Sequence, residues 1–519
     1  MQSSKKLLVL LLLPCCWAQT NAPVMTPRVA ARFLDQATWG PTPASIAELQ
    51  QMGISKWLAA QFALNTSDLP DQPILDANGK NNRNLAPVQQ AFFQNAVTGQ
   101  DQLRQRVAFA LSEIWVVSAV STKQAYAFPP YWRIFRDNAF GNYRDLIRAV
   151  TLSPAMGNYL NMANNNKANP SKGTAANENY SRELMQLFTL GLVQLNSDGS
   201  PVLDSNKNPV PTYDQAVVTS QAKALTGWTY PTAPGATAKA NNPAYYLGQM
   251  VAVEAEHDRT SKTLVAGVMI PAGQTAEQDL ESVLDALMAQ KTMAPFVCRQ
   301  LIEHLVTSNP SPAYIERVSS VFLDDGTGVR GNLQAVITAI LTDPEARAGD
   351  DPSAAPDPNF GHMREPVLFM ANLLRGLNAT LGPSSAPQND ATLMGQQLFY
   401  PPTVFSYFSP SYTLETGLAA PEFGIYSTQT AAERADVVNA AIYGALDKST
   451  KVDLSPFAKS ATSVSDLLDY IGYVFLHNQM SPALRQAATS AASAVTTPAA
   501  KAQAALYIVL SSGEYQIIQ

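Results

Sequence analysis

The chain has 519 residues, of which 46% are hydrophobic and only 15% are charged. Typical soluble domains carry about 25% charged residues, so uncharged polar side chains must supply much of the surface. The formal net charge is −6. A chain of this charge has no basic field that would attract phosphate groups, which excludes a nucleic-acid partner from our expectations.

The N-terminus has the pattern of a secretory signal peptide. Lys5 and Lys6 precede an unbroken apolar run over residues 7–13. We predict a signal peptide over residues 1–18, with cleavage after Ala22 as the alternative. The run is too short to span a membrane, which needs about 20 apolar residues. No later segment is long and apolar enough, so we expect an exported protein, periplasmic or secreted, whose mature chain has no transmembrane segment.

The three cysteines limit the covalent chemistry of the mature chain. Cys15 and Cys16 lie in the signal segment, and Cys298 is the remaining thiol, so no intramolecular disulfide is expected. The neighbours of Cys298 are largely apolar, which favours a buried, unreactive thiol over a nucleophile. A lipoprotein anchored at Cys15 is a weaker alternative, because Pro14 stands where a lipid-attachment motif requires a small residue.

After the signal, the chain has the pattern of many short helices separated by glycine and proline corners. Thr42 and Pro43 form one clear start, with Thr42 as N-cap and proline at the first helical position, and Gly53 ends that helix. Apolar residues at helical spacing predict further helices over residues 29–39, 86–98, 101–118, 127–139, 143–151, 178–190, 214–228, 276–290, 294–307, 312–323, 331–342, 364–377, 429–446, 464–476, 482–494 and 498–511.

Two stretches depart from this helical pattern. Turn residues within 192–213 are flanked by short extended runs, which predicts a small β-hairpin or flap. Short β-like runs also occur within 245–270. The predicted fold is mostly α, a multi-helix globular bundle with small β-hairpin excursions. We expect a single large helical domain over 28–519, with a sub-boundary at the proline-rich linker 345–360 as the alternative.

Several stretches carry a family resemblance, and they run in order from near residue 30 to the C-terminus. They include residues 31–42, 140–146, 151–157, 178–188, 224–228, 257–264, 299–302, 364–366, 402–410 and 510–516. Together they resemble DUF1800, a large bacterial family of exported proteins of unknown function. The resemblance implies a mostly helical exported protein without an established activity. It also implies a partner, a DUF1501-type exported protein similar to the sulfatase and alkaline-phosphatase fold, because the two families are often encoded side by side.

The most distinctive stretch combines two carboxylates, a guanidinium and a phenol at the start of a helix. Glu178 and Arg182 are four residues apart and can pair on one face, and Tyr180 and Glu183 can meet on an adjacent strip. Such a cluster is either a structural ion-pair network or a catalytic or ligand-binding site, since acid–base chemistry needs perturbed carboxylates. The structural interpretation is favoured, because structural networks perturb charges equally well.

A second candidate is the pair His257 and Asp258, with Lys262 close by. Imidazole and carboxylate are natural metal ligands, but protein metal sites usually need three or four ligands and no related histidine pair occurs. Metal and cofactor requirements are therefore unknown from sequence. His362, Arg364 and Glu365 at a predicted helix start are assigned to capping, and His304 and His477 to packed, hydrogen-bonded positions. The tryptophans and most aromatic residues are assigned to the core.

Two functions stay open, so whether the protein is an enzyme is undecided from sequence. One is a non-catalytic accessory or scaffold protein acting outside the cytoplasm. The other is a hydrolase-like enzyme that uses Glu178, Arg182 and Glu183 with His257 and Asp258. The enzyme hypothesis predicts that the two groups face one another across one concave pocket.

Overall fold

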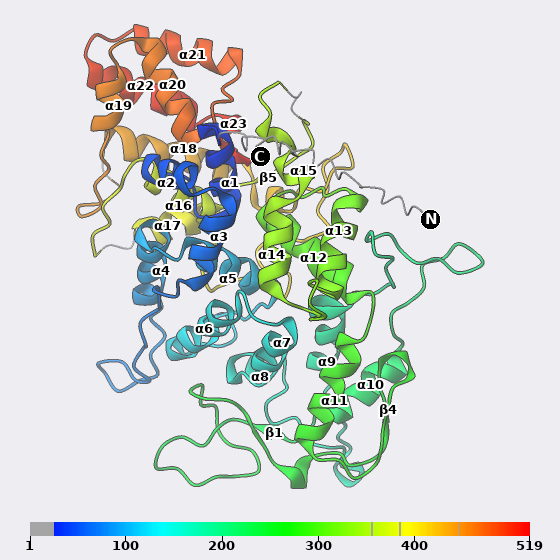
Figure 1. Cartoon of the computed structure of the whole chain (residues 1–519). Coiled ribbons are helices and arrows are strands. Elements are labelled where there is room, and N and C mark those ends of the chain that lie inside the picture. Colours follow the sequence, from blue (N-terminus) through cyan, green and yellow to red (C-terminus); the bar gives the residue numbers. More distant parts are fainter. Residues whose placement is uncertain (1–24, 354–356, 384–385, 445) are drawn as a thin grey trace, which may run out of the picture.

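A computed structural model describes residues 25–353, 357–383, 386–444 and 446–519 (Figure 1). The predicted signal peptide, its alternative cleavage point, and Cys15 and Cys16 lie outside the described residues. Helices dominate, and the three pairs of strands are only two residues long. The predicted mostly α fold is confirmed.

Helix starts follow from local capping. Thr42 accepts a hydrogen bond from the backbone N–H of Ser45, and the Ser45 hydroxyl accepts one from the Thr42 N–H. Pro43 occupies the first helical position and Gly53 ends the helix, as predicted. The N-terminal half before the central stretch contains α1 (Pro27–Ala37), α2 (Pro43–Met52), α3 (Ile54–Ala63), α4 (Ala86–Thr98), α5 (Gln102–Ile114), α6 (Phe128–Asn138), α7 (Tyr143–Thr151) and α8 (Pro154–Tyr159).

The central stretch is not one regular helix. A short α9 (Asn179–Glu183) continues into a π-helical segment, Leu184–Thr189. The predicted helix over 178–190 is therefore confirmed in place but wrong in regularity. The following helices are α10 (Gln215–Ala224), α11 (Ala276–Met288), α12 (Met293–Leu305), α13 (Pro312–Leu323), α14 (Leu333–Thr342) and α15 (Pro344–Arg347).

The C-terminal helices gather at one end of the molecule, and α9–α11 lie with β1 and β4 at the other (Figure 1). The C-terminal helices are α16 (Pro366–Gly376), α17 (Ala386–Leu393), α18 (Thr428–Tyr443), α19 (Ser455–Ser460), α20 (Val464–Phe475), α21 (Pro482–Ser493), α22 (Pro498–Leu510) and α23 (Gly513–Gln516). Helices α17, α19 and α23 were not predicted.

Three antiparallel pairs of strands supply the β structure. They are β1 (Trp228–Thr229) with β2 (Val251–Ala252), β3 (Lys262–Thr263) with β4 (Met269–Ile270), and β5 (His362–Met363) with β6 (Ile517–Ile518). The predicted excursion over 245–270 is confirmed. Residues 192–213 form isolated bridges, such as Val193 with Pro211, rather than strands. The β5–β6 pair was not predicted, because its strands are far apart in sequence.

Two helices are buried almost all round. Every residue of α16 is buried, and so is every residue of α5 except Ser112. Helix α5 nevertheless carries Arg104, Arg106 and Glu113, all less than 9% exposed. Buried charges are costly unless they are paired and hydrogen-bonded. The centre of the molecule therefore requires a polar network.

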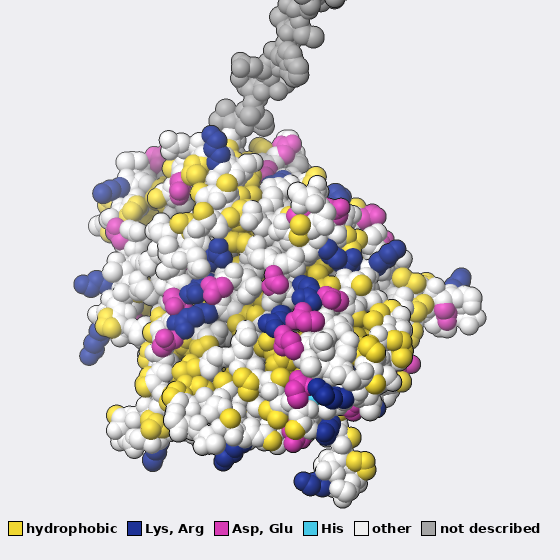
Figure 2. All heavy atoms as spheres, turned by 60° about the horizontal axis from the view of Figure 1, so that its bottom comes forward, with side chains coloured by type: hydrophobic (Ala, Val, Ile, Leu, Met, Phe, Trp, Pro, Cys, Tyr) yellow, Lys and Arg dark blue, Asp and Glu magenta, His cyan; other side chains and the backbone are white. Residues whose placement is uncertain are grey.

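Some of the surface charges are paired. Figure 2 shows basic and acidic side chains side by side on one face of the molecule, surrounded by uncharged surface. Pairs such as Arg144 with Glu281, at 2.7 Å, join α7 to α11. In the described part of the chain, no helix is long and apolar enough to cross a membrane. Cys298 is fully buried, as predicted, and burial raises the pKa of its thiol.

Candidate functional site

Glu178 lies at the surface and ties α9 to α10. Its carboxylate accepts hydrogen bonds from Thr219 Oγ1 at 2.6 Å, Gln215 Nε2 at 2.7 Å and Arg182 Nη2 at 3.0 Å. These bonds, the one from Thr219 foremost, hold the pKa of Glu178 below its usual value. The predicted Glu178–Arg182 pair is thus formed. Hydrogen bonds to both oxygens keep the Glu178 carboxylate ionised, as expected of a residue that holds α9 and α10 together.

Tyr180 and Glu183 leave the same helix in different environments. The Tyr180 hydroxyl is buried and lies 2.6 Å from Thr151 Oγ1. Glu183 is half-buried, and this burial raises the pKa of its carboxyl group. Its charge contributes to the raised pKa values of Tyr159 and Tyr213, which places all three side chains near one another. Tyr180 therefore binds Thr151, whereas Glu183 Oε2 is buried without a hydrogen-bond partner among the described residues.

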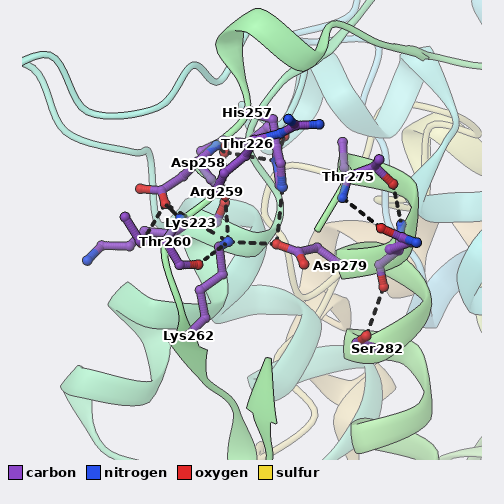
Figure 3. A network of polar contacts seen from close by, with 12 residues as sticks. Lys223, Thr226, His257, Asp258, Arg259, Thr260, Lys262, Thr275, Asp279 and Ser282 are labelled. Carbon is purple, nitrogen blue, oxygen red and sulfur yellow. Dashed lines mark hydrogen bonds and ion pairs between the residues drawn. The ribbon is translucent and has the colours of Figure 1, made fainter. Parts of the chain in front are cut away.

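His257 belongs to a buried network between α10 and the first turn of α11 (Figure 3). Its Nδ1 lies 2.9 Å from the carbonyl oxygen of Thr226, and its Nε2 lies 3.1 Å from Asp279 Oδ2. The Asp258 N–H donates to Thr226 Oγ1 at 2.9 Å, and Asp258 Oδ1 accepts from the Thr260 N–H at 2.8 Å. Both predicted residues therefore have their polar atoms bound within the protein.

Lys262 completes this network. Its Nζ lies 2.7 Å from Asp279 Oδ2, and neither side chain has any exposed surface. The same amino group donates to the carbonyl oxygens of Asp258 and Thr260. An ammonium group has three donors, and here all three have acceptors. Asp279 Oδ1 is buried without a hydrogen-bond partner among the described residues. The bonds of Lys262 and His257 to Asp279 Oδ2 fit a network that fixes the segment containing β3 and β4 against α10 and α11.

The Glu178 group and the His257 group were predicted to form one site, but they bind at two different points along and just beyond α10. Thr219 in α10 binds Glu178, and Thr226, just beyond the end of α10, binds His257 and Asp258. Seven residues of helix correspond to roughly 10 Å. Among the described residues, no hydrogen bond or ion pair joins the Glu178 group to the His257 group.

A polar cluster that the sequence reasoning did not single out lies where α5 meets the start of α16. Glu113 is in the last turn of α5, and Glu365 immediately precedes α16. The side-chain amide of Gln396 donates to both carboxyl groups, to Glu113 Oε1 at 3.2 Å and to Glu365 Oε2. The amide is oriented by the Val367 N–H, which donates to Gln396 Oε1 at 2.8 Å.

The two carboxyl groups lose their protons less easily than exposed carboxyl groups do. Burial, and then the charge of Glu365 to which it is hydrogen-bonded, raise the pKa of Glu113 well above its usual value. Burial also raises the pKa of Glu365. Two adjacent buried carboxylates cannot both ionise easily, so the first ionisation suppresses the second. Glu113, whose pKa is raised further, is therefore the more readily protonated member of the pair.

Arg106 and His304 flank this pair. Arg106 is fully buried and donates through Nη2 to the carbonyl oxygen of His304, while its Nε and Nη1 have no hydrogen-bond partner among the described residues. His304 Nδ1 lies 3.5 Å from Glu113 Oε2. Burial, followed by the charge of Arg106, lowers the pKa of His304 to about 3. The imidazole is thus neutral beside a fixed cation.

A further acid–imidazole pair lies close to these groups. His362 Nδ1 is 3.0 Å from Glu422 Oε1. The charge of His362 contributes to the lowered pKa of His304, and Glu422 contributes to the raised pKa of Glu113. His362 Nε2 and Glu422 Oε2 have no hydrogen-bond partner among the described residues. Together with Nε and Nη1 of Arg106, these atoms form a group of buried polar atoms without hydrogen-bond partners among the described residues.

We call Arg106, Glu113, His304, Glu365 and Gln396 the Glu113 cluster. Its chemistry is that of a carboxylic acid next to a carboxylate, with a nearby guanidinium that stabilises negative charge. The assignment of Glu365 to helix capping is wrong, because its side chain makes no capping hydrogen bond and points instead to Gln396. No set of three or more His, Cys, Asp or Glu side chains in the described segments is arranged to hold a metal ion.

No local pattern in the sequence pointed to this cluster. Arg106 and Glu113 lie within a predicted helix whose stripe of apolar residues already faces the core, so they were free to be solvent-exposed. Only the burial of the opposite face of α5 brings them inside. The partners come from α12, the start of α16 and the loop that contains Gln396, which no local pattern connects.

The chain belongs to the DUF1800 family. The family model, described as a protein of unknown function, matches residues 32–517. No curated protein and no solved structure matches the chain. The match confirms the resemblance predicted from sequence over nearly the whole chain, and the family description carries no reaction.

Proposed function

We propose that this DUF1800 protein is an extracytoplasmic hydrolase whose acid–base pair is Glu113 and Glu365. The observation that carries the proposal is that the side-chain amide of Gln396 donates to both of these buried carboxyl groups. Burial raises the pKa of each. Paired carboxyl groups whose pKa values are pushed apart supply an acid and a base at the same pH. The N-terminal signal pattern supports a location outside the cytoplasm, in the periplasm or beyond the cell.

The proposed reaction is hydrolysis of an acyl bond. The Glu365 carboxylate takes a proton from water, and the water oxygen attacks the carbonyl carbon. Glu113 gives its proton to the departing oxygen or nitrogen, so water is divided between the two products and no oxidant or reductant is needed. The charge of Arg106 favours the negative charge that develops on the carbonyl oxygen.

The closeness of the carboxyl groups favours an acyl bond over a glycosidic bond. Glycosidases hold their two carboxyl groups roughly 5 Å or more apart, because the reacting sugar carbon or a water must fit between them. Glu113 and Glu365 each accept a hydrogen bond from the same nitrogen of Gln396. Neighbouring carboxyl groups bridged in this way suit activation of a single water, as in carboxyl dyads that cleave amide bonds.

The test compares matched variants on a panel of p-nitrophenyl esters, peptide amides and p-nitrophenyl glycosides. Glu113→Gln and Glu365→Gln are expected to lower kcat/KM for an ester or amide by at least about 100-fold, the usual contribution of a general acid or base. Glu316→Gln, at an exposed position on α13, is the control and should match the wild type.

Other outcomes would contradict the assignment. Loss of activity in Glu178→Gln, with Glu113→Gln unaffected, would move the chemistry to the group predicted from sequence. Turnover of glycosides alone would overturn the acyl reaction. A folded wild-type protein that cleaves nothing in the panel would count against an enzyme.

An accessory or scaffold function is the second candidate, and the extensive internal bonding of the Glu178 and His257 networks favours it. Their charged groups are bound within the protein, as expected of ties that fix helix packing. On this proposal a DUF1501-type exported protein is the partner. Co-purification of that partner with the wild type, unchanged in Glu113→Gln, would support it, whereas separate elution at micromolar concentration would oppose it.

A further inference from the structure

An aromatic recess adjoins the Glu113 cluster. Glu113 lies at its edge, and the recess is lined mainly by rings of α5, α6 and the loop that follows Gln396. Those rings are Phe109, Phe128, Trp132, Phe135, Phe399 and Tyr407. Because Glu113 is one of its lining residues, a group attached to the scissile carbonyl would enter this recess.

The walls of the recess are rigid. Phe128, Trp132 and Phe135 are at most 5% exposed. The Phe399 ring packs against Phe128 with centroids 5.7 Å apart and against Trp132 at 6.4 Å. Because side chains in such cores sit close-packed in fixed rotamers, the recess cannot widen without disturbing its neighbours.

Phe399 shows that the loop forming one wall is held under constraint. Its φ is 70°, in the left-handed region that a bulky residue rarely adopts. The conformation is held in place by the Ala119 N–H, which donates to the Phe399 carbonyl at 2.9 Å. Strain of this kind persists only where surrounding structure enforces it, and it concentrates at ligand sites.

The size of the recess limits what it can hold. It provides about 40 Å³ of space. One water needs roughly 10–15 Å³ on this measure, and a cavity of about 150 Å³ accommodates benzene. The space therefore suits a group of one or two carbon atoms and is too small for an aromatic ring or a long chain.

We infer that the aromatic recess binds the methyl group of an acetyl substrate, so that the protein hydrolyses acetyl esters or acetyl amides in preference to longer acyl groups. This inference rests on the proposed function, because it takes Glu113 as the acid beside the carbonyl. Phe135 is then a specificity-determining residue. A pocket discriminates against an extra methylene by roughly 10-fold to 200-fold.

The experiment measures kcat/KM for p-nitrophenyl acetate, butyrate and octanoate. The value for Glu113→Gln is subtracted from each, so that only Glu113-dependent hydrolysis is compared. The wild type should prefer acetate over butyrate by at least about 10-fold. Phe135→Leu enlarges the recess and should lower that ratio at least several-fold. Phe322→Leu, at a fully buried position on α13, is the matched control for core loosening and should leave the ratio unchanged.

The results separate the two proposals. Glu113-dependent hydrolysis with equal or greater preference for butyrate or octanoate overturns the acetyl inference and leaves the hydrolase proposal standing. An acetate-to-butyrate ratio that Phe135→Leu and Phe322→Leu change equally also overturns it, because the effect is then general. Hydrolysis that does not depend on Glu113 overturns both. If Phe135→Leu does not fold, Phe128→Leu repeats the test from the start of the same helix.

Discussion

Replacing Asp279 by Asn should destabilise the protein strongly, although it changes only one oxygen to nitrogen. Asp279 and Lys262 are fully buried and lie 2.7 Å apart. The substitution leaves the Lys262 ammonium with two carbonyl oxygens and the Asp258 carboxylate, whose Oδ1 is 3.9 Å away. Breaking a buried pair by removing one partner costs about 3–5 kcal/mol. Because Asp258 remains, we expect the lower end, about 3 kcal/mol.

The assay is urea unfolding followed by circular dichroism, with hydrogen exchange of the segment over 257–270 as a local measure. Asp279→Asn should lower the free energy of unfolding and release protection in that segment. Asp285→Asn is the control, because this exposed acid pairs with Arg144 at the surface and such pairs contribute about 0–1 kcal/mol.

A double-mutant cycle checks the mechanism. If the cost comes from the uncompensated Lys262 charge, Lys262→Met combined with Asp279→Asn should cost less than the sum of the two single changes, by roughly 0.5–3 kcal/mol. Two results would refute the view that Asp279 and Lys262 form a stabilising buried ion pair. One is a free energy of unfolding for Asp279→Asn within about 1 kcal/mol of the wild type, and the other is strict additivity of the two single changes.

Three further predictions follow from other parts of the molecule. Burial and the charge of Glu365 raise the folded-state pKa of Glu113. The stabilisation from its protonated form is complete below the unfolded pKa of about 4.5 and is lost as pH rises through the folded value. Glu113→Gln does not ionise, so its melting temperature relative to the wild type should rise as the pH is raised above about 4.5, and a constant difference would contradict this. Cys298 is fully buried with a raised thiol pKa, so a thiol reagent should label it only after denaturation, and labelling of the native protein at the rate of a free thiol would show otherwise. Gly227 has a φ of 85°, and a Cβ there would lie 2.9 Å from the His257 backbone nitrogen; Gly227→Ala should cost at least about 1–2 kcal/mol in the urea assay, and a neutral effect would mean that this contact relaxes freely.

Patterns that act within one or two helical turns were readable in the sequence. The Thr42 cap, the Glu178–Arg182 pair and the buried Cys298 were all predicted and are all present. Each depends on residue spacing of up to four positions or on a local apolar environment, which any sequence displays directly. The helical pattern, and with it the fold class, is predictable for the same reason.

The proposed catalytic pair was not readable in this way. The side chain of Gln396 joins Glu113 to Glu365, although Gln396 and Glu113 are 283 residues apart in sequence. Glu365 at the head of a predicted helix has the local pattern of a capping residue, and Glu113 that of a solvent-exposed helix position. Glu113 and Glu365 are buried only because other parts of the chain pack around α5 and α16 on nearly all sides.

The sequence by itself therefore determined the helices, their caps, the family and the short-range ion pairs. The tertiary structure alone decided which polar groups lose their water and which neighbours replace it. The perturbed pKa of Glu113 arises from that loss of water and from a carboxyl group far away along the chain. Desolvation depends on what packs around a group in three dimensions, and residue spacing carries no record of it.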